Sequence, residues 1–178
     1  MLRWLGDAVP EVGIALVPAA VVLLVLVMLR AREGGLPVAL RVTLPDAAIA
    51  ITVVPLLVLT LRPVALFGED ATRINLIPLR EEIVDALGPP GLGFAVIELL
   101  GNILAFAAVG AALAWRFRRL SMRVAGIGVG ILSLGIETAQ AFIDAGRTAD
   151  ITDLATNLAG GLLGFVVVRK EQRRAEET

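Results

Sequence analysis

The side chains that could do chemistry in this 178-residue chain are carboxylates, amides, hydroxyls and guanidinium groups, because the chain contains no cysteine and no histidine. Thiol nucleophiles, imidazole acid–base catalysis, disulfides and Cys/His metal sites are therefore excluded. A metal would need oxygen ligands, which suit Mg²⁺ or Ca²⁺. The sequence carries no known metal-ligand motif, so we predict no cofactor. Mg²⁺ stays the alternative, because oxygen ligands could bind it.

Three apolar stretches carry polar side chains at helical spacing, so that each set falls on one face of a helix. In a membrane, an ionisable side chain near mid-bilayer costs at least about 2.5–3.5 kcal/mol, and such a face would be very unfavourable against lipid. We therefore expect the three faces to meet and to form one polar pocket. The sets are Glu98 with Asn102, Ser133 with Glu137 and Gln140, and Asp150 with Asp153 and Asn157.

Two of these carboxylates, Glu98 and Glu137, make the strongest functional case. Both are expected to be buried, and neighbouring buried carboxylates need a proton, an arginine or a metal to be stable. Arg147 is the nearest candidate cation in the sequence.

Structural explanations stay open for the other polar residues. Intramembrane Ser133 and Gln140 could simply join helices through hydrogen bonds. Asp144, Arg147 and Asp150 could be solvated loop charges. Asp150 could also cap the helix that follows it, because aspartate is a favoured N-cap residue.

The elements that must position these residues are membrane-spanning helices. The chain is 57% hydrophobic and 19% charged, with a mean hydropathy of +0.85, whereas soluble domains are about 45–50% apolar and about 25% charged. Val12–Leu29 carries no charge and is close to the roughly 20 residues that cross a bilayer. No small-x-small cleavage site follows it, so we interpret it as a retained helix.

We predict an all-α polytopic membrane helix bundle with about five transmembrane helices and a short interfacial helix. Residues 1–61 would hold two N-terminal helices, residues 62–168 an outer loop with three more helices, and residues 169–178 a disordered charged cytoplasmic tail. The predicted spans are about 11–30, 45–61, 92–115, 124–143 and 151–168.

The distribution of arginine and lysine predicts the orientation. Basic residues gather in the links between spans one and two and between spans three and four, and after span five. Cytoplasmic loops carry such an excess, so five spans put the N-terminus outside and the C-terminus in the cytoplasm. The three polar faces then lie in the outer half of the bilayer, with Glu98, Glu137 and Asn157 roughly 9 Å below its surface at 1.5 Å per residue.

The long loop at 62–91 contains an amphipathic segment. Leu79, Ile83, Val84 and Leu87 share one face, opposite a polar face that includes Glu82. This pattern predicts a short helix in the outer interface. The preceding residues 74–78 could dip into the membrane if they are buried against the polar pocket. Whether residues 74–87 form a lid, a re-entrant segment or a surface helix stays open.

Glycines at four-residue spacing occur in two of the predicted spans. The pairs are Gly126 with Gly130 and Gly160 with Gly164. Small residues at this spacing let helix backbones approach closely in membranes, so we predict a packing role.

The polar motifs together resemble the VanZ-like family, in order and in spacing, over residues 73–168. The resemblance implies a multi-pass protein of the bacterial cell (inner) membrane with a role in the envelope, since the family is named for a teicoplanin-resistance factor, and it gives no catalytic assignment. The first two spans lie outside its strongest part. The motifs are Asn75-Leu-Ile-Pro78, Glu98-x-x-Gly-Asn102, Ser133-x-x-Ile-Glu137-x-x-Gln140 and Arg147-x-x-Asp150-x-x-Asp153-x-x-x-Asn157.

We consider three functions for the predicted pocket. The first is a non-enzymatic envelope factor that binds a membrane lipid, a lipid-linked cell-wall precursor or a glycopeptide-type amphiphile. Arg147, with Arg73 or Arg80, would contact phosphate or carboxylate. The predicted ligand-binding residues are Asn75, Glu98, Asn102, Glu137, Gln140, Arg147, Asp150, Asp153 and Asn157.

The second is a membrane enzyme for a lipid-linked phosphate or glycan substrate, using carboxylate acid–base or Mg²⁺-assisted chemistry. The third, a transporter or proton relay, is disfavoured because the inner half of the bundle lacks polar groups. The net charge of −1 gives no indication of nucleic-acid binding, and the oligomeric state is open.

Overall fold

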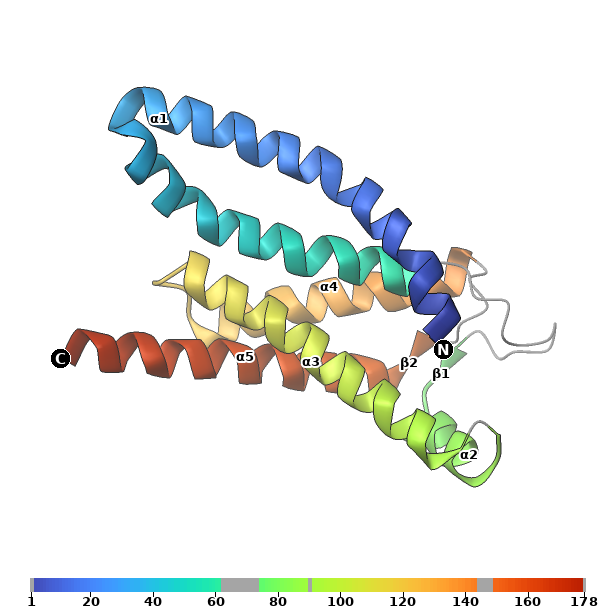
Figure 1. Ribbon diagram of the computed structural model, residues 1–178. Helices are drawn as coiled ribbons and strands as arrows, with labels where there is room; N and C mark the ends of the chain where they lie inside the picture. Colours follow the sequence, from blue (N-terminus) through green and yellow to red (C-terminus); the bar gives the residue numbers. More distant parts are fainter. Residues whose placement is uncertain (1, 62–73, 90, 144–148, 178) are drawn as a thin grey trace.

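The computed structural model describes residues 2–61, 74–89, 91–143 and 149–177. Long helices dominate these residues, which confirms the predicted all-α bundle, and a pair of two-residue strands is added to them (Figure 1). The elements are α1 (Leu2–Leu61), β1 (Ile74–Asn75), α2 (Arg80–Leu87), α3 (Leu92–Arg116), α4 (Met122–Ile143), β2 (Ala149–Asp150) and α5 (Ile151–Glu177).

Helix α1 consists of two arms that meet at Gly35. Gly35 has φ 77° and ψ 165°, which is not helical and which glycine adopts without the steric cost of a Cβ. Pro37 follows at the start of the second arm, where a missing N–H is tolerated. The predicted spans 11–30 and 45–61 are confirmed as helix, but the link between them is almost entirely helical rather than a loop (Figure 1).

Four helices within the described residues are long and apolar enough to cross a membrane. The first of them, Val9–Leu61, contains both arms of α1. Each arm exceeds the roughly 20 residues needed for one crossing. The two arms and the helices α3, α4 and α5 therefore correspond to the five predicted spans.

Helices α3 and α5 pack with their backbones in close contact. A Cβ atom at any of three glycines would overlap a backbone carbonyl of the other helix. This contact confirms the predicted packing role of Gly160 and Gly164. The facing positions are Gly110 against Gly161, Gly160 against Ile103 and Gly164 against Ala107.

The predicted packing role of the glycine pair in α4 is wrong for one member. A Cβ at Gly130 would meet no atom within 4 Å, whereas one at Gly126 would lie 3.2 Å from the side chain of Leu162. In α4, the close approach to α5 involves Val129, whose side chain lies where a Cβ of Gly161 would stand.

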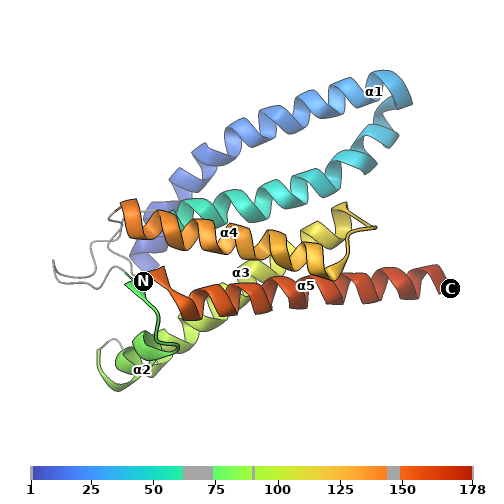
Figure 2. The same ribbon diagram turned by 180° about the vertical axis from the view of Figure 1, so that it is seen from behind.

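The apolar core joins the second arm of α1 to α3 and α4. Its buried side chains are Leu56, Phe106, Val109, Val129 and Ile136. The first arm of α1 stands apart from the other helices in both views (Figures 1 and 2), and most of its large apolar side chains are exposed. In a membrane these side chains face lipid.

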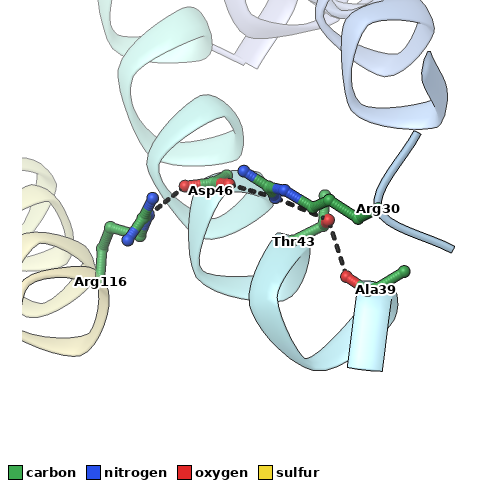
Figure 3. Close-up of polar contacts among 5 residues, drawn as sticks. All are labelled: Arg30, Ala39, Thr43, Asp46 and Arg116. Atoms are coloured by element: carbon green, nitrogen blue, oxygen red, sulfur yellow. Dashed lines mark hydrogen bonds and ion pairs between the residues drawn. The ribbon is translucent and has the colours of Figure 1, made fainter. Parts of the chain in front are cut away.

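An ion-pair network holds both arms of α1 and α3 together at the end where α1 bends (Figure 3). Asp46 accepts a hydrogen bond from Arg30 Nη1 at 2.8 Å and also pairs with Arg116. Arg30 Nη1 donates to Thr43 Oγ1 at 2.8 Å, and Thr43 donates to the carbonyl of Ala39. The bend of α1 is thereby fixed to the end of α3.

The prediction of a disordered tail is wrong, because α5 continues to Glu177. Arg169 Nη2 donates to the carbonyls of Phe117 at 2.5 Å and Leu120 at 3.0 Å, and Gln172 donates to the carbonyl of Ala114 at 3.3 Å. These bonds satisfy carbonyls at and after the end of α3 that lack a helical partner. They anchor α5 beyond the apolar segment.

The two ends of the bundle carry different elements of the fold. The α1 bend and the C-terminus lie at one end, and the N-terminus, the strand pair and α2 lie at the other (Figures 1 and 2). A chain that crosses the membrane an odd number of times must have its two termini at opposite ends of the bundle. Which end faces outside stays a prediction from the arginine distribution.

Candidate functional site

The site begins with a parallel strand pair that the sequence did not reveal. Strand β1 pairs with β2 in the register Ile74 to Ala149 and Asn75 to Asp150. The pair joins the loop before α2 to the start of α5, segments that are remote in the chain. It places Asn75 beside Asp150 and buries both, at 2% and 6% exposure.

Asp150 connects three elements through both its side chain and its backbone. Its Oδ2 accepts from Asn75 Nδ2 at 2.7 Å, and its N–H donates to Glu137 Oε2 of α4 at 2.9 Å. Its Oδ1 accepts from the N–H of Thr152 at 2.7 Å. This last bond is the helix cap that the sequence offered as the structural explanation for Asp150, so Asp150 both caps α5 and holds Asn75.

Asp153 lies one turn further along α5 and connects it to α3. Asn102 Nδ2 donates to Asp153 Oδ1 at 2.5 Å. Asp153 also interacts electrostatically with Glu137, Glu98 and Asp150. Polar residues from α3, α4, β2 and α5 therefore lie together at one end of the bundle, as the helical spacing predicted.

The expected burial of the two glutamates is only half right. Glu137 is buried, with 7% exposure, whereas Glu98 is exposed on α3. Glu98 precedes Asn102 by one turn and therefore lies closer to the end of the helix. Within the chain, Glu98 belongs to the rim of the site rather than to its interior.

Three further polar residues make hydrogen bonds between helices. Asn157 Nδ2 donates to Ser133 Oγ at 3.0 Å, and Gln140 Nε2 donates to the carbonyl of Thr60 at 2.9 Å. All three are at most 4% exposed. These bonds join helices, which is the structural role considered for Ser133 and Gln140. Asn157 has the same role.

Glu82 of α2 is a site residue that the sequence analysis missed. It is 8% exposed and interacts with Thr152, Asp150 and Asp153. Its Oε2 has no hydrogen-bond partner among the described residues. Amphipathic periodicity placed Glu82 on a polar face, but it could not show that this face packs against the bundle.

Burial is the largest influence on Glu82, and it raises the pKa of this carboxyl above its ordinary value. The charges of Asp150 and Asp85 raise the pKa further, while hydrogen bonds to Thr152 and to its own backbone oppose them. A glutamate with a raised pKa keeps its proton to a higher pH than an exposed one.

The backbone also fixes α2 against α5. Leu79, which precedes α2, has φ 59°, a left-handed conformation that is uncommon for leucine. Its N–H donates to Thr152 Oγ1 at 2.9 Å. The apolar face of α2 points away from the bundle, because Ile83, Val84 and Leu87 are 53–86% exposed. This arrangement fits the predicted interfacial helix.

Most of the predicted cations lie in segments that the structure does not describe. Arg147, Asp144 and Arg73 lie outside the described residues. Arg80 is described and is exposed at the start of α2. The predicted cations of the site are therefore represented only by Arg80 in the part of the chain that the structure describes.

The carboxylates in the described part of the chain do not form a geometry suited to a metal ion. Within residues 2–61, 74–89, 91–143 and 149–177, no group of three Asp or Glu side chains could hold one. Mg²⁺ and Ca²⁺ need several oxygen ligands at about 2.0–2.6 Å. The described residues therefore do not fit the Mg²⁺ that the chemistry left open.

The fold and the site define a multi-pass helical membrane protein with a polar cluster at one end of its bundle. A family model described as VanZ/LLP1 matches residues 47–170, and the chain belongs to that family. The match begins at residue 47, so it includes most of the second arm of α1, which the resemblance of motifs left out. No curated protein and no solved structure matched the chain.

Proposed function

We propose that this membrane protein binds the head group of an amphiphile at its polar cluster, on the outer face of the bacterial cell membrane. The amphiphile is a membrane lipid, a lipid-linked cell-wall precursor or a glycopeptide-type antibiotic. The proposal is supported chiefly by the gathering of Asn75, Asn102, Glu137, Asp150 and Asp153 from five elements.

Stability alone does not explain this gathering of charge. Carboxylates that lie close together repel one another, and burial adds a desolvation cost. Apolar side chains could pack the helices without this cost. Groups held at such a cost are concentrated in binding and catalytic sites, where a ligand uses them.

The amide and carboxylate groups suit a polar head group rather than an apolar ligand. Asn102 and Asp153 offer both a donor and an acceptor near the rim, and Glu98 is exposed beside them. The outward direction rests on the basic residues at the opposite end, which favour the cytoplasm.

Binding to purified protein tests the proposal. Native mass spectrometry would compare the wild type with Asp153→Asn, using teicoplanin, an undecaprenyl-linked lipid and common phospholipids as probes. Loss of a hydrogen bond to a charged group costs about 1.5–3 kcal/mol, so we expect binding of one probe to weaken at least about tenfold. Glu33→Gln, an exposed position at the α1 bend, is the matched control. If no probe binds the wild type, the proposal is wrong.

Arg147 remains part of the proposal as the residue that meets a phosphate or carboxylate of the ligand. Arginine binds such groups through two parallel hydrogen bonds. Arg147→Ala should weaken binding of the same probe, whereas Arg123→Ala, an exposed position near the start of α4, should not. Equal binding by both variants would remove Arg147 from the site.

An enzyme acting on a lipid-linked substrate is the second candidate. The observation that favours it is Glu82, a buried carboxyl with a raised pKa, which is the property expected of a general acid. Turnover of undecaprenyl-linked phosphate and glycan lipids would be measured for the wild type and Glu82→Gln, together with metal analysis. Turnover that Glu82→Gln abolishes would favour the enzyme; binding without turnover would favour the envelope factor.

A further inference from the structure

Three carboxylates of the site lack a cationic partner in the described structure. We call Glu82, Asp150 and Asp153 the acidic trio; they come from α2, β2 and α5. Each interacts electrostatically with the other two. None of them pairs with a lysine or arginine of the described residues, where their hydrogen-bond partners are amides, a hydroxyl and backbone N–H groups.

A buried acceptor accompanies this negative charge. Glu82 Oε2 is buried and has no hydrogen-bond partner within the described residues, although the great majority of buried polar atoms in proteins have one. The residue is more than nine-tenths buried, and its neighbours are Thr152 and Asp150. Glu82 therefore keeps an unused acceptor, Oε2, on a side chain that interacts with Thr152 and Asp150, and a ligand that reaches this oxygen could donate a hydrogen bond to it.

The ligand that fits is a cation with hydrogen-bond donors. A divalent metal ion would need a tight set of oxygen ligands, and the described carboxylates do not form one. An ammonium group carries one positive charge and three donors, and it tolerates acceptors that are further apart. Its charge would also offset the repulsion within the trio.

The surface around the trio indicates an amphiphile. Three apolar residues of α2, the helix that carries Glu82, are 53–86% exposed: Ile83, Val84 and Leu87. An apolar helix face of this kind lies among acyl chains at the membrane interface. A lipid next to α2 would have its chains against this face and its head group near Glu82.

We propose that the acidic trio recognises an ammonium group carried by a membrane amphiphile, with Glu82 Oε2 accepting one of its hydrogen bonds. This inference rests on the proposed function and adds the chemical class of the head group. It also assigns α2 a direct part in binding.

The test compares lipids that differ only at the amine. Purified wild-type protein in detergent is titrated with phosphatidylethanolamine, with its N-acetylated derivative and with phosphatidylglycerol, all with the same acyl chains. We expect the free amine to bind at least about tenfold more tightly than either of the other two, because a charge-assisted hydrogen bond is lost in both. Equal binding of the amine and its N-acetylated form would overturn the inference.

A variant and a soluble competitor complete the design. Glu82→Gln should reduce the preference for the amine at least about tenfold, and the control Glu33→Gln should leave it unchanged. Free ethanolamine should not displace the lipid at matched concentration; if it does, the site recognises the amine alone and the amphiphile part is wrong. The comparison of lipids on the wild type does not depend on how well Glu82→Gln folds.

The outcomes separate this inference from the proposed function. If phosphatidylglycerol binds as tightly as phosphatidylethanolamine and Asp153→Asn weakens both, the amine inference fails and the proposed function stands. If neither these lipids nor teicoplanin nor an undecaprenyl-linked lipid binds the wild type, both fail.

Discussion

The bond between Asn102 and Asp153 offers a direct thermodynamic test of the site. It joins α3 to α5 at 2.5 Å, at the end of a helix pair whose closest packing lies deeper, around Gly160 and Gly164. The perturbation is a double-mutant cycle of Asn102→Ala, Asp153→Ala and the double variant. Such a cycle isolates the interaction of the two side chains from the other effects of each substitution.

The expected coupling is about 0.5–1.5 kcal/mol. Hydrogen bonds to charged groups contribute about 1.5–3 kcal/mol in soluble proteins, but cycles in membrane proteins average about 0.6 kcal/mol with a maximum near 1.7 kcal/mol. Both residues are partly exposed, so water competes for each of them and keeps the value in the lower range.

The assay is reversible unfolding in mixed detergent micelles, with helicity as the signal. A control cycle pairs Asp153→Ala with Glu33→Ala, which lies at the α1 bend, and should be additive. Additivity of the Asn102 cycle within about 0.3 kcal/mol would show that the two side chains do not interact, and the polar link between α3 and α5 would then be wrong.

Three further predictions concern packing, pH and the α1 bend. Gly164→Val should lower the free energy of unfolding by about 1–3 kcal/mol or more, because the valine side chain would overlap the Ala107 carbonyl. The control Gly130→Val should have little effect. Thermal unfolding in detergent measures both variants, and equal losses of stability would contradict the packing of α3 against α5. The pKa of Glu82 is raised above 4.5 in the folded protein, so its contribution to stability is full below pH 4.5 and is lost as the pH rises through the folded-state pKa. The stability of Glu82→Gln relative to wild type should therefore increase from pH 4 to neutral pH, and a constant difference across that range would refute this sign. Asp46→Asn removes the acceptor shared by two arginines and should cost about 1–3 kcal/mol in micelle unfolding, and a neutral substitution would mean that the network does not hold the bend.

The parts of the fold that the sequence predicted depend on local patterns. The apolar lengths of α3, α4 and α5 and the amphipathic face of α2 follow from periodicity within each segment. The meeting of Asn102 with Asp153 followed from polar faces that lipid would penalise. The close packing of Gly160 and Gly164 followed from their spacing.

The parts that were missed depend on contacts between distant segments. The helical link in α1 turns at Gly35 and is held by Asp46 and Arg116, which no local pattern identifies. The extension of α5 depends on Arg169 reaching carbonyls after α3. Likewise, Glu82 entered the site because Thr152 fixes the start of α2. Tertiary contacts of this kind override local propensity.

The most direct test of the central claim is a disulfide across β1 and β2, because the claim is that these remote segments meet at the outer end of the bundle. The chain has no native cysteine, and Ile74 pairs with Ala149 at a strand spacing of about 4.8 Å that a disulfide can span. Ile74→Cys with Ala149→Cys should cross-link in whole cells, and a membrane-impermeant reductant should cleave the bond. The control Ile74→Cys with Val167→Cys should not cross-link. Absence of the Ile74–Ala149 disulfide, or cleavage only after the membrane is permeabilised, would contradict the account.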